Sequence, residues 1–535
     1  MADDIAKSVV ARFEHMYAQR APWHNLWQQI TDYIMPNRGD FPNDPNMHAT
    51  GEDRTGQIFD GTAIWANEQF ASGLSSFVVN PTEKWFALTS GDERVDRIRA
   101  VKEWLQIAES EMYAVFNSPR SNFYGQIHEM FLDIGGFGTA MMMVEEMKND
   151  SMIRYMTYPL AECYIAEGPD GLVDTLYRQY TRTAKQLVDM YGDKVALPDA
   201  VTVALEKEPT KRFEVIHAIE PRVVFDADKG DALNMPYRSA IVLKTGCVLL
   251  EESGYREFPV AASRWVLVSG EEYGRSPGMN CIYDVKMVNT MRKTIIRSAQ
   301  KIVDPPLQMP DEGFMMPVKL NPSSINYFEA GISQHDRIMP IQTGGNPYLG
   351  MDIVQSHIEQ ILRCYYIDLM QIMKNVEMTA TEVLQRTEDR MRLMAPMVTR
   401  FQHEALDRAI TRTFNILRRR RRIPDPPEEL AGIDIKYSSQ VARAQKATRL
   451  FEFQRFLESL ANVAQFKPEI IDRLDGDGAF EFAHHLLDAP VSITVPQQIV
   501  DQIRAQRNAQ NNAAQGAEAL GKLAPWIKAN SEKQQ

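Results

Sequence analysis

Two long helical patterns with narrow apolar seams bracket a proline- and glycine-rich insert in this chain. The first pattern covers residues 277–304 and ends at a Pro-Pro pair, and the second covers residues 348–370. In each pattern, apolar residues recur at three- and four-residue spacing, which is typical of a helix with one buried stripe. The insert between them, residues 305–347, lacks this period. The sequence therefore predicts a helical hairpin that carries a compact head.

The region before this hairpin changes from helical to strand periodicity. Helical patterns come first, at 62–78, 95–116 and 124–134. Residues 139–270 then show strand patterns, and the turn signals between them lie at 148–150, 168–171 and 245–246. A short helix is expected near 183–192. Because the strands are grouped apart from the helices, the pattern indicates an α+β fold rather than an α/β fold.

Two aromatic- and proline-rich blocks open the chain. They contain four of its seven tryptophans: Trp23, Trp27, Trp65 and Trp85. Pro22 suits the first turn of a helix, where its missing N–H is not needed, so we expect a helix to begin there and to end near Pro36. Of the four tryptophans, we expect Trp23, Trp27 and Trp85 in a hydrophobic core.

Composition narrows the class of protein. A chain of 535 residues is too long for one core, and a net charge of −12 argues against a surface that grips nucleic acid throughout. The four cysteines have no metal-binding spacing and are expected to be idle thiols: Cys163, Cys247, Cys281 and Cys364. The N-terminus lacks a signal-peptide profile and no apolar run approaches the ~20 residues that span a bilayer. We therefore expect a soluble intracellular protein with no membrane partner.

Several segments approach functional motifs, but each lacks an essential part. Residues 274–278 match the GxSxG elbow, yet Pro277 has no N–H to donate to an oxyanion, which favours a loop that enters a helix. Residues 51–56 have P-loop glycine spacing, but Gln57 replaces the phosphate-binding lysine. Residues 475–478 read Asp-Gly-Asp-Gly, but their carboxylates do not have the spacing of an EF-hand calcium loop. A tight turn is favoured there. We predict no catalytic, cofactor-binding or metal-binding residues.

One strongly basic run stands out: Arg418, Arg419, Arg420, Arg421 and Arg422. It is open to two interpretations. The run could contact phosphate or DNA. Alternatively, it could be a solvated helix end, where cations complement the helix dipole before Pro424 stops the helix. A helical pattern leads to this run from Thr379, and Pro396 inside it predicts a kink.

The two opening blocks resemble a signature of the portal (head-to-tail connector) proteins of short-tailed bacteriophages. Later segments are similar to further landmarks of that family, in order and spacing: residues 121–124, 136–140, 273–276, 379–383 and 423–426, with Pro396, Glu404 and Leu406. Pro396 departs from the pattern, since some relatives have glycines there. The tail beyond residue 496 matches no landmark.

The resemblance implies an α+β, ring-forming portal fold with a wing, a two-helix stem, a clip, a tunnel loop with a kinked helix, and a helical C-terminal crown. Its implied segments are a wing at 1–276, stem helices at 277–304 and 348–370, a clip at 305–347, a tunnel loop at 371–378, a kinked helix returning to the wing at 379–445, a crown at 446–495 and a low-complexity tail at 496–535. Lys374, Asn375 and Glu377 would lie on the tunnel loop and face the DNA.

The implied function is a dodecameric ring at one capsid vertex, through which double-stranded DNA is packaged and ejected. The implied partners are further copies of the chain, the major capsid protein, the scaffolding protein, the terminase large subunit (transiently), head–tail adaptor or tail proteins, and the DNA in the channel. Such a protein is not an enzyme, has no cofactor, and belongs to a virion assembled in the host cytoplasm. Two alternatives stay open: a nucleic-acid-processing enzyme with an unrecognised site, and another virion core or tail scaffold protein.

Overall fold

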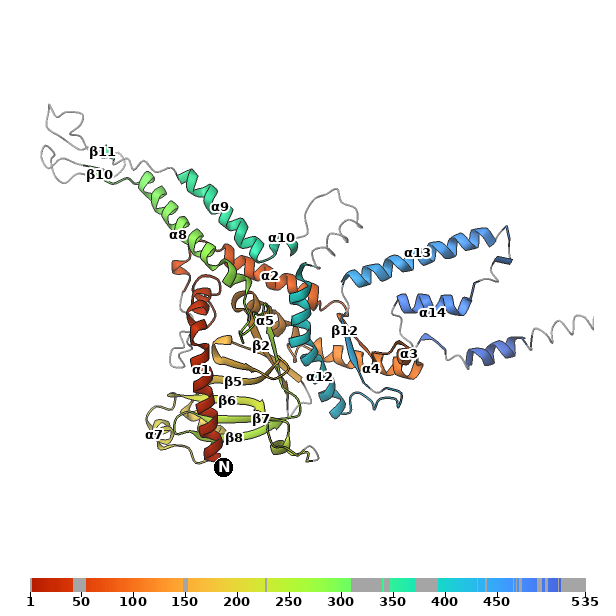
Figure 1. Ribbon diagram of the computed structural model, residues 1–535, viewed down its shortest axis with the longest axis horizontal. Coiled ribbons are helices and arrows are strands. Elements are labelled where there is room, and N and C mark those ends of the chain that lie inside the picture. The colour runs from red at the N-terminus through yellow and green to blue at the C-terminus, as the bar shows by residue number, and fades with distance from the viewer. Residues whose placement is uncertain are drawn as a thin grey trace, which may run out of the picture. The chain divides into compact units, whose positions relative to one another are not determined.

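The computed structural model describes most of the chain and divides it into two compact units. The described residues are 2–41, 54–147, 153–226, 229–308, 339–340, 347–370, 393–430, 432–437 and, with short gaps, 440–510. The first unit comprises Met1–Trp85 and Met112–Arg422, and the second comprises Phe86–Glu111 and Ile423–Gln535. Both helices and sheets are present, so the α+β prediction is confirmed at this level (Figure 1).

The larger sheet of the first unit is an antiparallel meander of five strands in chain order. The strands are β4 (Cys163–Glu167), β5 (Val173–Thr183), β6 (Arg212–Pro221), β7 (Tyr237–Leu243) and β8 (Val248–Tyr255). Gly171 and Gly246 adopt φ of +74° and +81° in the connections before β5 and β8. Glycine takes this left-handed conformation without a Cβ penalty, which is why both predicted turns form where they do.

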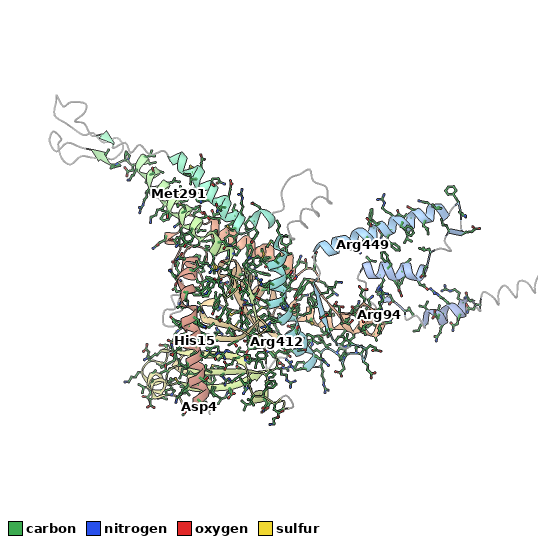
Figure 2. The ribbon with its side chains drawn as sticks, in the orientation of Figure 1. Asp4, His15, Arg94, Met291, Arg412 and Arg449 are labelled. Carbon is green, nitrogen blue, oxygen red and sulfur yellow. The ribbon has the colours of Figure 1, made fainter. Side chains whose placement is uncertain are left out.

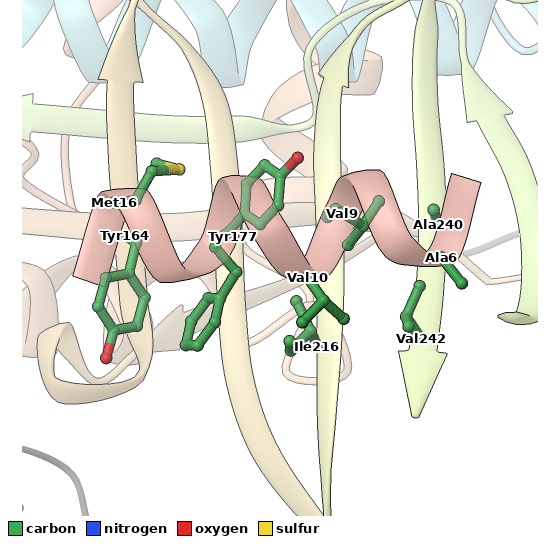
Figure 3. Packing of buried hydrophobic residues seen from close by; sticks show 11 residues of the cluster. Ala6, Val9, Val10, Met16, Tyr164, Tyr177, Ile216, Ala240 and Val242 are labelled. Carbon is green, nitrogen blue, oxygen red and sulfur yellow. The ribbon is translucent and has the colours of Figure 1, made fainter. Parts of the chain in front are cut away.

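Helices cover both faces of this sheet. Helix α1 (Ala2–Tyr33) lies across one face, where Val9, Val10 and Met16 pack on Tyr177 and Ile216 among others (Figure 3). Helices α6 (Ala184–Tyr191) and α7 (Asp199–Lys207) pack with the alternate strand residues. Successive strand residues point to opposite faces, so each strand serves both layers. The helix predicted near 183–192 is confirmed.

The prediction that the first helix begins at Pro22 is wrong. Helix α1 begins at Ala2 and runs through Pro22 without ending. The buried residues Ala6, Val9, Phe13 and Met16 extend one apolar stripe through the preceding turns. Their burial against the sheet outweighs the ~3 kcal/mol that an interior proline costs a helix.

The smaller sheet of the first unit has three antiparallel strands in the order β3-β2-β9. Strand β2 (Thr139–Glu146) pairs with β3 (Ile153–Tyr158) in the predicted hairpin, and with β9 (Val260–Arg264) on its other edge. The predicted turn at 148–150 lies outside the described residues. Helix α5 (Phe123–Phe137) packs on β2 and β3, and α2 (Thr62–Val78) packs on α5. Both helices confirm the patterns at 62–78 and 124–134.

The predicted core tryptophans differ in burial. Trp27 and Trp85 are fully enclosed, whereas Trp23 is half-buried. Trp85 stacks on Phe123, with ring centroids 5.9 Å apart, beside α5. Trp23 stacks on Trp27 and carries the Arg275 guanidinium 4.8 Å from its ring centroid. The prediction is therefore confirmed for two of the three, while Trp23 forms an edge of the core.

Two long helices follow the sheets and run side by side in Figure 1. Helix α8 (Pro277–Val303) ends at the predicted place, and α9 (Pro347–Cys364) is followed by the short α10 (Ile367–Met370). Tyr366, at φ +57°, breaks the second predicted helix between α9 and α10. Within the insert, β10 (Leu307–Gln308) pairs with β11 (Met339–Pro340); most of the rest lies outside the described residues.

The helix that leads to the basic run is interrupted once. Residues 393–401 are helical and include Pro396. A π-helical turn, η5 (Gln402–Leu406), then precedes α12 (Asp407–Arg419). The break in the α-helical hydrogen-bond pattern therefore lies at η5, six or more residues after the proline at which a kink was predicted. Single π turns inside helices often re-aim a functional side chain.

The second unit joins an early segment of the chain to a late one. Strand β1 (Phe86–Thr89) pairs antiparallel with β12 (Asp434–Tyr437), and the N–H of Leu88 donates to the buried Glu109, 2.8 Å away. Helices α3 (Glu93–Asp96) and α4 (Arg99–Phe116) follow β1. Helices α13 (Gln440–Ala464) and α14 (Gly476–Leu486) follow β12 and meet through Phe453 and Phe482.

Candidate functional site: the base of the α8–α9 helix pair

The segment that resembles a nucleophile elbow starts α8. Ser276 is the N-cap: its Oγ accepts from the N–H of Met279 at 2.9 Å and donates to the carbonyl of Gly136 at 2.7 Å. Pro277 takes the first helical position, where its missing N–H costs nothing. Both hydrogen-bonding functions of the serine are thus used to start the helix and to bind it to α5. The expectation of a loop entering a helix is confirmed.

Two glycines let the backbone on either side of this start pass in close contact. Gly138 has φ +76°, and a Cβ there would collide with the carbonyl of Gly274 and with the backbone of Arg275. A Cβ on Gly274 would in turn collide with the carbonyl of Gly138. No side chain fits between these segments, so glycine is required at both positions. This close contact holds the base of α8 against the start of β2.

The base of the helix pair is the end at which α8 begins and α9 ends. Contacts near this base fix the register of the two helices. A Cβ on Gly278 would lie 2.7 Å from the hydroxyl of Tyr365, and Asp284 Oδ1 lies 2.9 Å from His357 Nδ1. Further out, Ile295 packs over Gly350, where a Cβ would lie 3.3 Å away. The seam is buried at Val288, but Ile302 near the far end is 54% exposed. The predicted apolar stripe is therefore covered only near the base.

A buried ion pair ties the π-helical turn to the sheets. Arg264, the last residue of β9, places Nη2 2.8 Å from Glu404 Oε1, and its backbone N–H donates to Glu404 Oε2 at 2.9 Å. The same guanidinium binds Glu167 and donates to the carbonyl of Gly171 at 2.9 Å. Arg264 is completely enclosed and Glu404 nearly so. The pair thus links both sheets, the 168–172 turn and η5 through one side chain.

A second buried arginine explains the first aromatic block. Arg20 of α1 donates to the carbonyls of Leu160, Ala161 and Cys163, at 3.1, 2.9 and 2.5 Å. Its guanidinium also lies 4.1 Å from the ring centroid of Tyr164. These bonds give buried donors to two carbonyls of the turn before β4 and to the carbonyl of Cys163, the first residue of β4. Spacing along the sequence gave no signal for this role, because the three acceptors are backbone atoms.

The arginine run ends α12 and binds the end of β2 and the connection between β8 and β9. Arg419 pairs with Glu257 at 2.8 Å and Arg420 pairs with Glu146 at 2.6 Å. Arg421 has φ +55°, and the N–H of Arg422 returns to the carbonyl of Leu417 at 3.0 Å, which closes the helix. All five residues lie at the surface, and the paired side chains of Arg419 and Arg420 are partly covered.

Nearly two turns before the run on α12, Arg412 (labelled in Figure 2) is buried. Its Nε donates to the carbonyl of Val144 at 2.8 Å, and burial lowers its pKa. Arg412 therefore fastens the body of α12 to β2, while the exposed run completes the helix end. This geometry supports the helix-end interpretation of the run.

The other predicted site residues lie outside the described residues. Lys374, Asn375 and Glu377 fall between α10, which ends at Met370, and the helical residues that begin at 393. The described residues on either side of their segment both belong to the first unit. No contact of Lys374, Asn375 or Glu377 is therefore described.

The remaining near-motifs have structural roles where they are described. Arg54, at the edge of the P-loop-like segment, forms a two-bond ion pair with Asp40, at 2.7 and 2.8 Å. Asp475 accepts from the N–H of Asp477 at 3.0 Å and starts α14, so the segment predicted as a tight turn is a helix N-terminus. Among the described residues, no cluster of His, Cys, Asp or Glu is arranged to hold a metal ion.

The most perturbed carboxyl near the helix base is Asp133 of α5. Arg38 Nε lies 3.0 Å from Asp133 Oδ1, but neither carboxylate oxygen has a hydrogen-bond partner among the described residues. Burial raises the pKa of Asp133 to about 7, against the attraction of Arg38, and Glu129 adds to the rise. A buried carboxyl without hydrogen bonds is a cost to the fold when ionised.

Comparison with known proteins identifies the family. The sequence matches the family described as bacteriophage head to tail connecting protein over residues 6–494. The chain belongs to this family. A probable portal protein of Bordetella phage BPP-1 is 32% identical over 528 residues, which cover 96% of this chain and 93% of the relative. The portal protein of Salmonella phage epsilon15 is 32% identical over 537 residues, covering 98% and 95%.

Among solved structures, a chain titled "Neck of empty GTA particle computed with C6 symmetry" is similar with a TM-score of 0.36 and 9% identity. The match covers 74% of this chain and 87% of that one. At this level the likeness carries no argument about this protein.

Membership in the connector family confirms several sequence predictions. The recognition of a portal protein is correct, and connector proteins are structural components, so the chain is not an enzyme. The connector role implies a ring oligomer that associates with capsid and tail, as a virion component at a capsid vertex. No described helix is long and apolar enough to cross a membrane.

Proposed function

We propose that the chain forms a dodecameric portal ring at one capsid vertex, with a central channel for packaging and ejecting double-stranded DNA. The observation that carries this proposal is the near full-length relationship to two portal proteins. The helix pair α8–α9, fixed at its base and apolar along its length, supplies the element that would pack around the channel. In this role the ring first receives the terminase large subunit and later the head–tail adaptor or tail proteins.

The segments of the portal fold follow from the same proposal. We assign the wing to 1–276, the stem to α8 and α9, the clip to 305–347, the tunnel loop to 371–378, the returning kinked helix to 379–445 and the crown to 446–495. The capsid and scaffolding proteins would meet the ring during assembly in the host cytoplasm. The low-complexity residues 496–535 form a tail with no assigned role.

Exposed apolar side chains on the helix pair support ring closure. A ring requires a head-to-tail interface, in which one face of a subunit meets a different face of its neighbour. Apolar residues that are at least two-fifths exposed lie along both helices: Tyr283, Met287, Ile296, Ile302, Met351 and Ile353. In a monomer these side chains would stay in water. Neighbouring helix pairs in a ring would bury them.

Electron microscopy of the purified full-length protein in negative stain tests this function. A portal gives closed rings with a central hole, whereas another virion scaffold gives open stacks or tubes. Replacing Ile296 and Met351 with Glu should shift the protein from rings to smaller species. A matched change on α7, Val203→Glu, should leave the rings intact, because Val203 is exposed away from the helix pair. A monodisperse monomer at high concentration would refute the proposal.

Lys374, Asn375 and Glu377 are proposed to contact DNA from the tunnel loop. An acidic channel repels phosphate, so a single basic residue would act as a sparse positional contact rather than a grip. Particles carrying Lys374→Ala or Lys374→Glu should package or retain less DNA than the wild type. Lys207→Ala, on α7, serves as the control. Normal DNA content in both Lys374 variants would remove the residue from the mechanism.

The arginine run is proposed to complete α12 rather than to bind DNA. Two of its members already pair with Glu146 and Glu257, which leaves less charge for phosphate. Replacing Arg418 and Arg421 with Gln should leave the affinity of the ring for duplex DNA unchanged. A loss of affinity together with a salt dependence that is shallower by about two ions would instead establish a DNA contact.

A further inference from the structure

Two cysteines lie at the base of the α8–α9 pair, one on each helix. Cys281 lies on the second turn of α8 and is fully buried, and Cys364 is the last residue of α9 and is half-buried. The register between the helices places them at the same level. Gly278, one turn before Cys281, faces Tyr365, which follows Cys364, and Asp284, one turn after Cys281, binds His357. Both are free thiols.

We propose that Cys281 and Cys364 are a redox-reactive pair that closes to a disulfide between the two helices. The proposal goes beyond the portal function and does not depend on it, because it concerns the thiol chemistry of this chain alone. The other two cysteines do not lie on this helix pair. Cys163 is buried in β4, and Cys247 lies in the tight turn before β8 at φ +49°.

The surroundings give the two thiols different roles. The interaction with Cys281 lowers the pKa of Cys364, against the opposing effects of burial and of Asp284. The same interaction, together with burial, raises the pKa of Cys281. The thiolate is the nucleophile in disulfide exchange, so the more exposed Cys364 attacks first and Cys281 follows.

The oxidant we name is a small-molecule disulfide such as oxidised glutathione. The Cys364 thiolate attacks one sulfur of that disulfide, forms a mixed disulfide and expels the other half as a thiolate. Cys281 then loses its proton and attacks the sulfur of Cys364, which expels the second half. One small disulfide is reduced to two thiols, while the two protein thiols are oxidised to one disulfide.

The bond would cross the base of the helix pair, directly before the break at Tyr366. In the reduced protein, the described part of α9 is joined to α8 by packing and by the Asp284–His357 contact. In the oxidised protein, the last residue of α9 would be covalently fixed to α8. A particle that passes from a reducing interior to an oxidising exterior would thus gain a permanent link at this point.

Peptide mapping by mass spectrometry after incubation with oxidised glutathione tests the proposal on the purified full-length protein. We expect a linked peptide that contains Cys281 and Cys364, with loss of two titratable thiols out of four. Cys247→Ser is the matched control and should form the same link. Recovery of both thiols unmodified, or of two separate glutathione adducts, would overturn the proposal.

Two variants separate the order of attack from simple exposure. Cys281→Ser should stop at the mixed disulfide on Cys364, because the second nucleophile is missing. Cys364→Ser should leave Cys281 unmodified, because it is buried. Cys281→Ala and Cys364→Ala repeat both tests in case serine is poorly tolerated, and the elution volume of each variant reports its assembly state. Glutathione on Cys281 in the Cys364→Ser protein would contradict the assigned order.

Discussion

Arg264 and Glu404 form an enclosed ion pair across 140 residues of sequence, with Nη2 and Oε1 2.8 Å apart. The arginine comes from the end of β9 and the glutamate from η5. The carboxylate of Glu404 accepts from both the side chain and the backbone of Arg264. The pair therefore fixes the returning helix to the sheets at the base of α8.

Removing the Glu404 carboxylate should destabilise the first unit. Glu404→Ala leaves the Arg264 charge buried with one partner fewer, which we expect to cost about 3–5 kcal/mol. Urea denaturation of the purified protein measures this free energy of unfolding. The control is Glu271→Ala, which breaks the partly exposed Arg275–Glu271 pair and should cost about 1 kcal/mol or less. Equal costs for the two variants would contradict a structural role for the buried pair.

Replacing Gly138 with Ala should cost more than replacing Gly171. Both glycines have nearly the same positive φ, +76° and +74°, so both variants incur about 1 kcal/mol of backbone strain. Only at Gly138 would the added Cβ collide with the backbone of 274–276, whereas nothing lies within 4 Å at Gly171. The difference between the two melting temperatures isolates the close contact. A Gly138→Ala protein as stable as Gly171→Ala would show that the backbone relaxes without cost.

Arg20 should not tolerate lysine. A lysine keeps the charge but cannot place three donors in the planar fork that reaches the carbonyls of Leu160, Ala161 and Cys163. We expect Arg20→Lys to cost about 2–4 kcal/mol, because at least one buried carbonyl loses its donor. Arg12→Lys on the same helix is the control, since Arg12 is half exposed where it meets Glu220. Its cost, read from the same thermal melts, should stay below about 1 kcal/mol.

Asp133 should make the stability of the first unit depend on pH. Its pKa is about 7 in the folded protein and about 4 in an unfolded chain, so the folded state binds the proton more tightly. The resulting stabilisation is full below pH 4 and is lost as the pH rises to about 7, by at most ~1.4 kcal/mol per pH unit.

The variant Asp133→Asn isolates this effect. It removes the titrating group, so its free energy of unfolding relative to the wild type should rise from pH 5 to pH 8. His24 and His217 act in the opposite sense, because burial lowers the pKa of each to about 4. They are unchanged in the variant and cancel in the difference. A difference that stays constant with pH would show that Asp133 is ionised throughout.

Local patterns made the elements of the first unit predictable. The turns at Gly171 and Gly246, the start of α8 at Pro277 and the helix stop after Val303 depend on residues within a few positions of one another. Glycine, proline and a capping hydroxyl limit the backbone directly, so their positions carry the information. The helix start at Pro22 was wrong because a local rule was applied where burial of the preceding apolar stripe decides.

The contacts that define the helix base were not predictable from one sequence. Arg264 meets Glu404, and Cys281 lies near Cys364, only because distant segments fold together. Neither pair has a characteristic spacing, and the cysteines had been expected to be idle. The family resemblance located the helix pair but said nothing about these side chains. The partner of a buried charge depends on the tertiary structure, which a single sequence does not specify locally.

The pairing of β1 with β12 bears on how the chain is made. Phe86 meets Tyr437 across about 350 residues, so the ribosome must synthesise that whole stretch before the first strand finds its partner. At about 5–20 residues per second, this takes about 20 to 70 s. The first strand waits during this time with an unpaired edge, which is open to association with other nascent chains. Formation of this ladder therefore marks the earliest moment at which the two segments of the second unit can join in a newly made subunit.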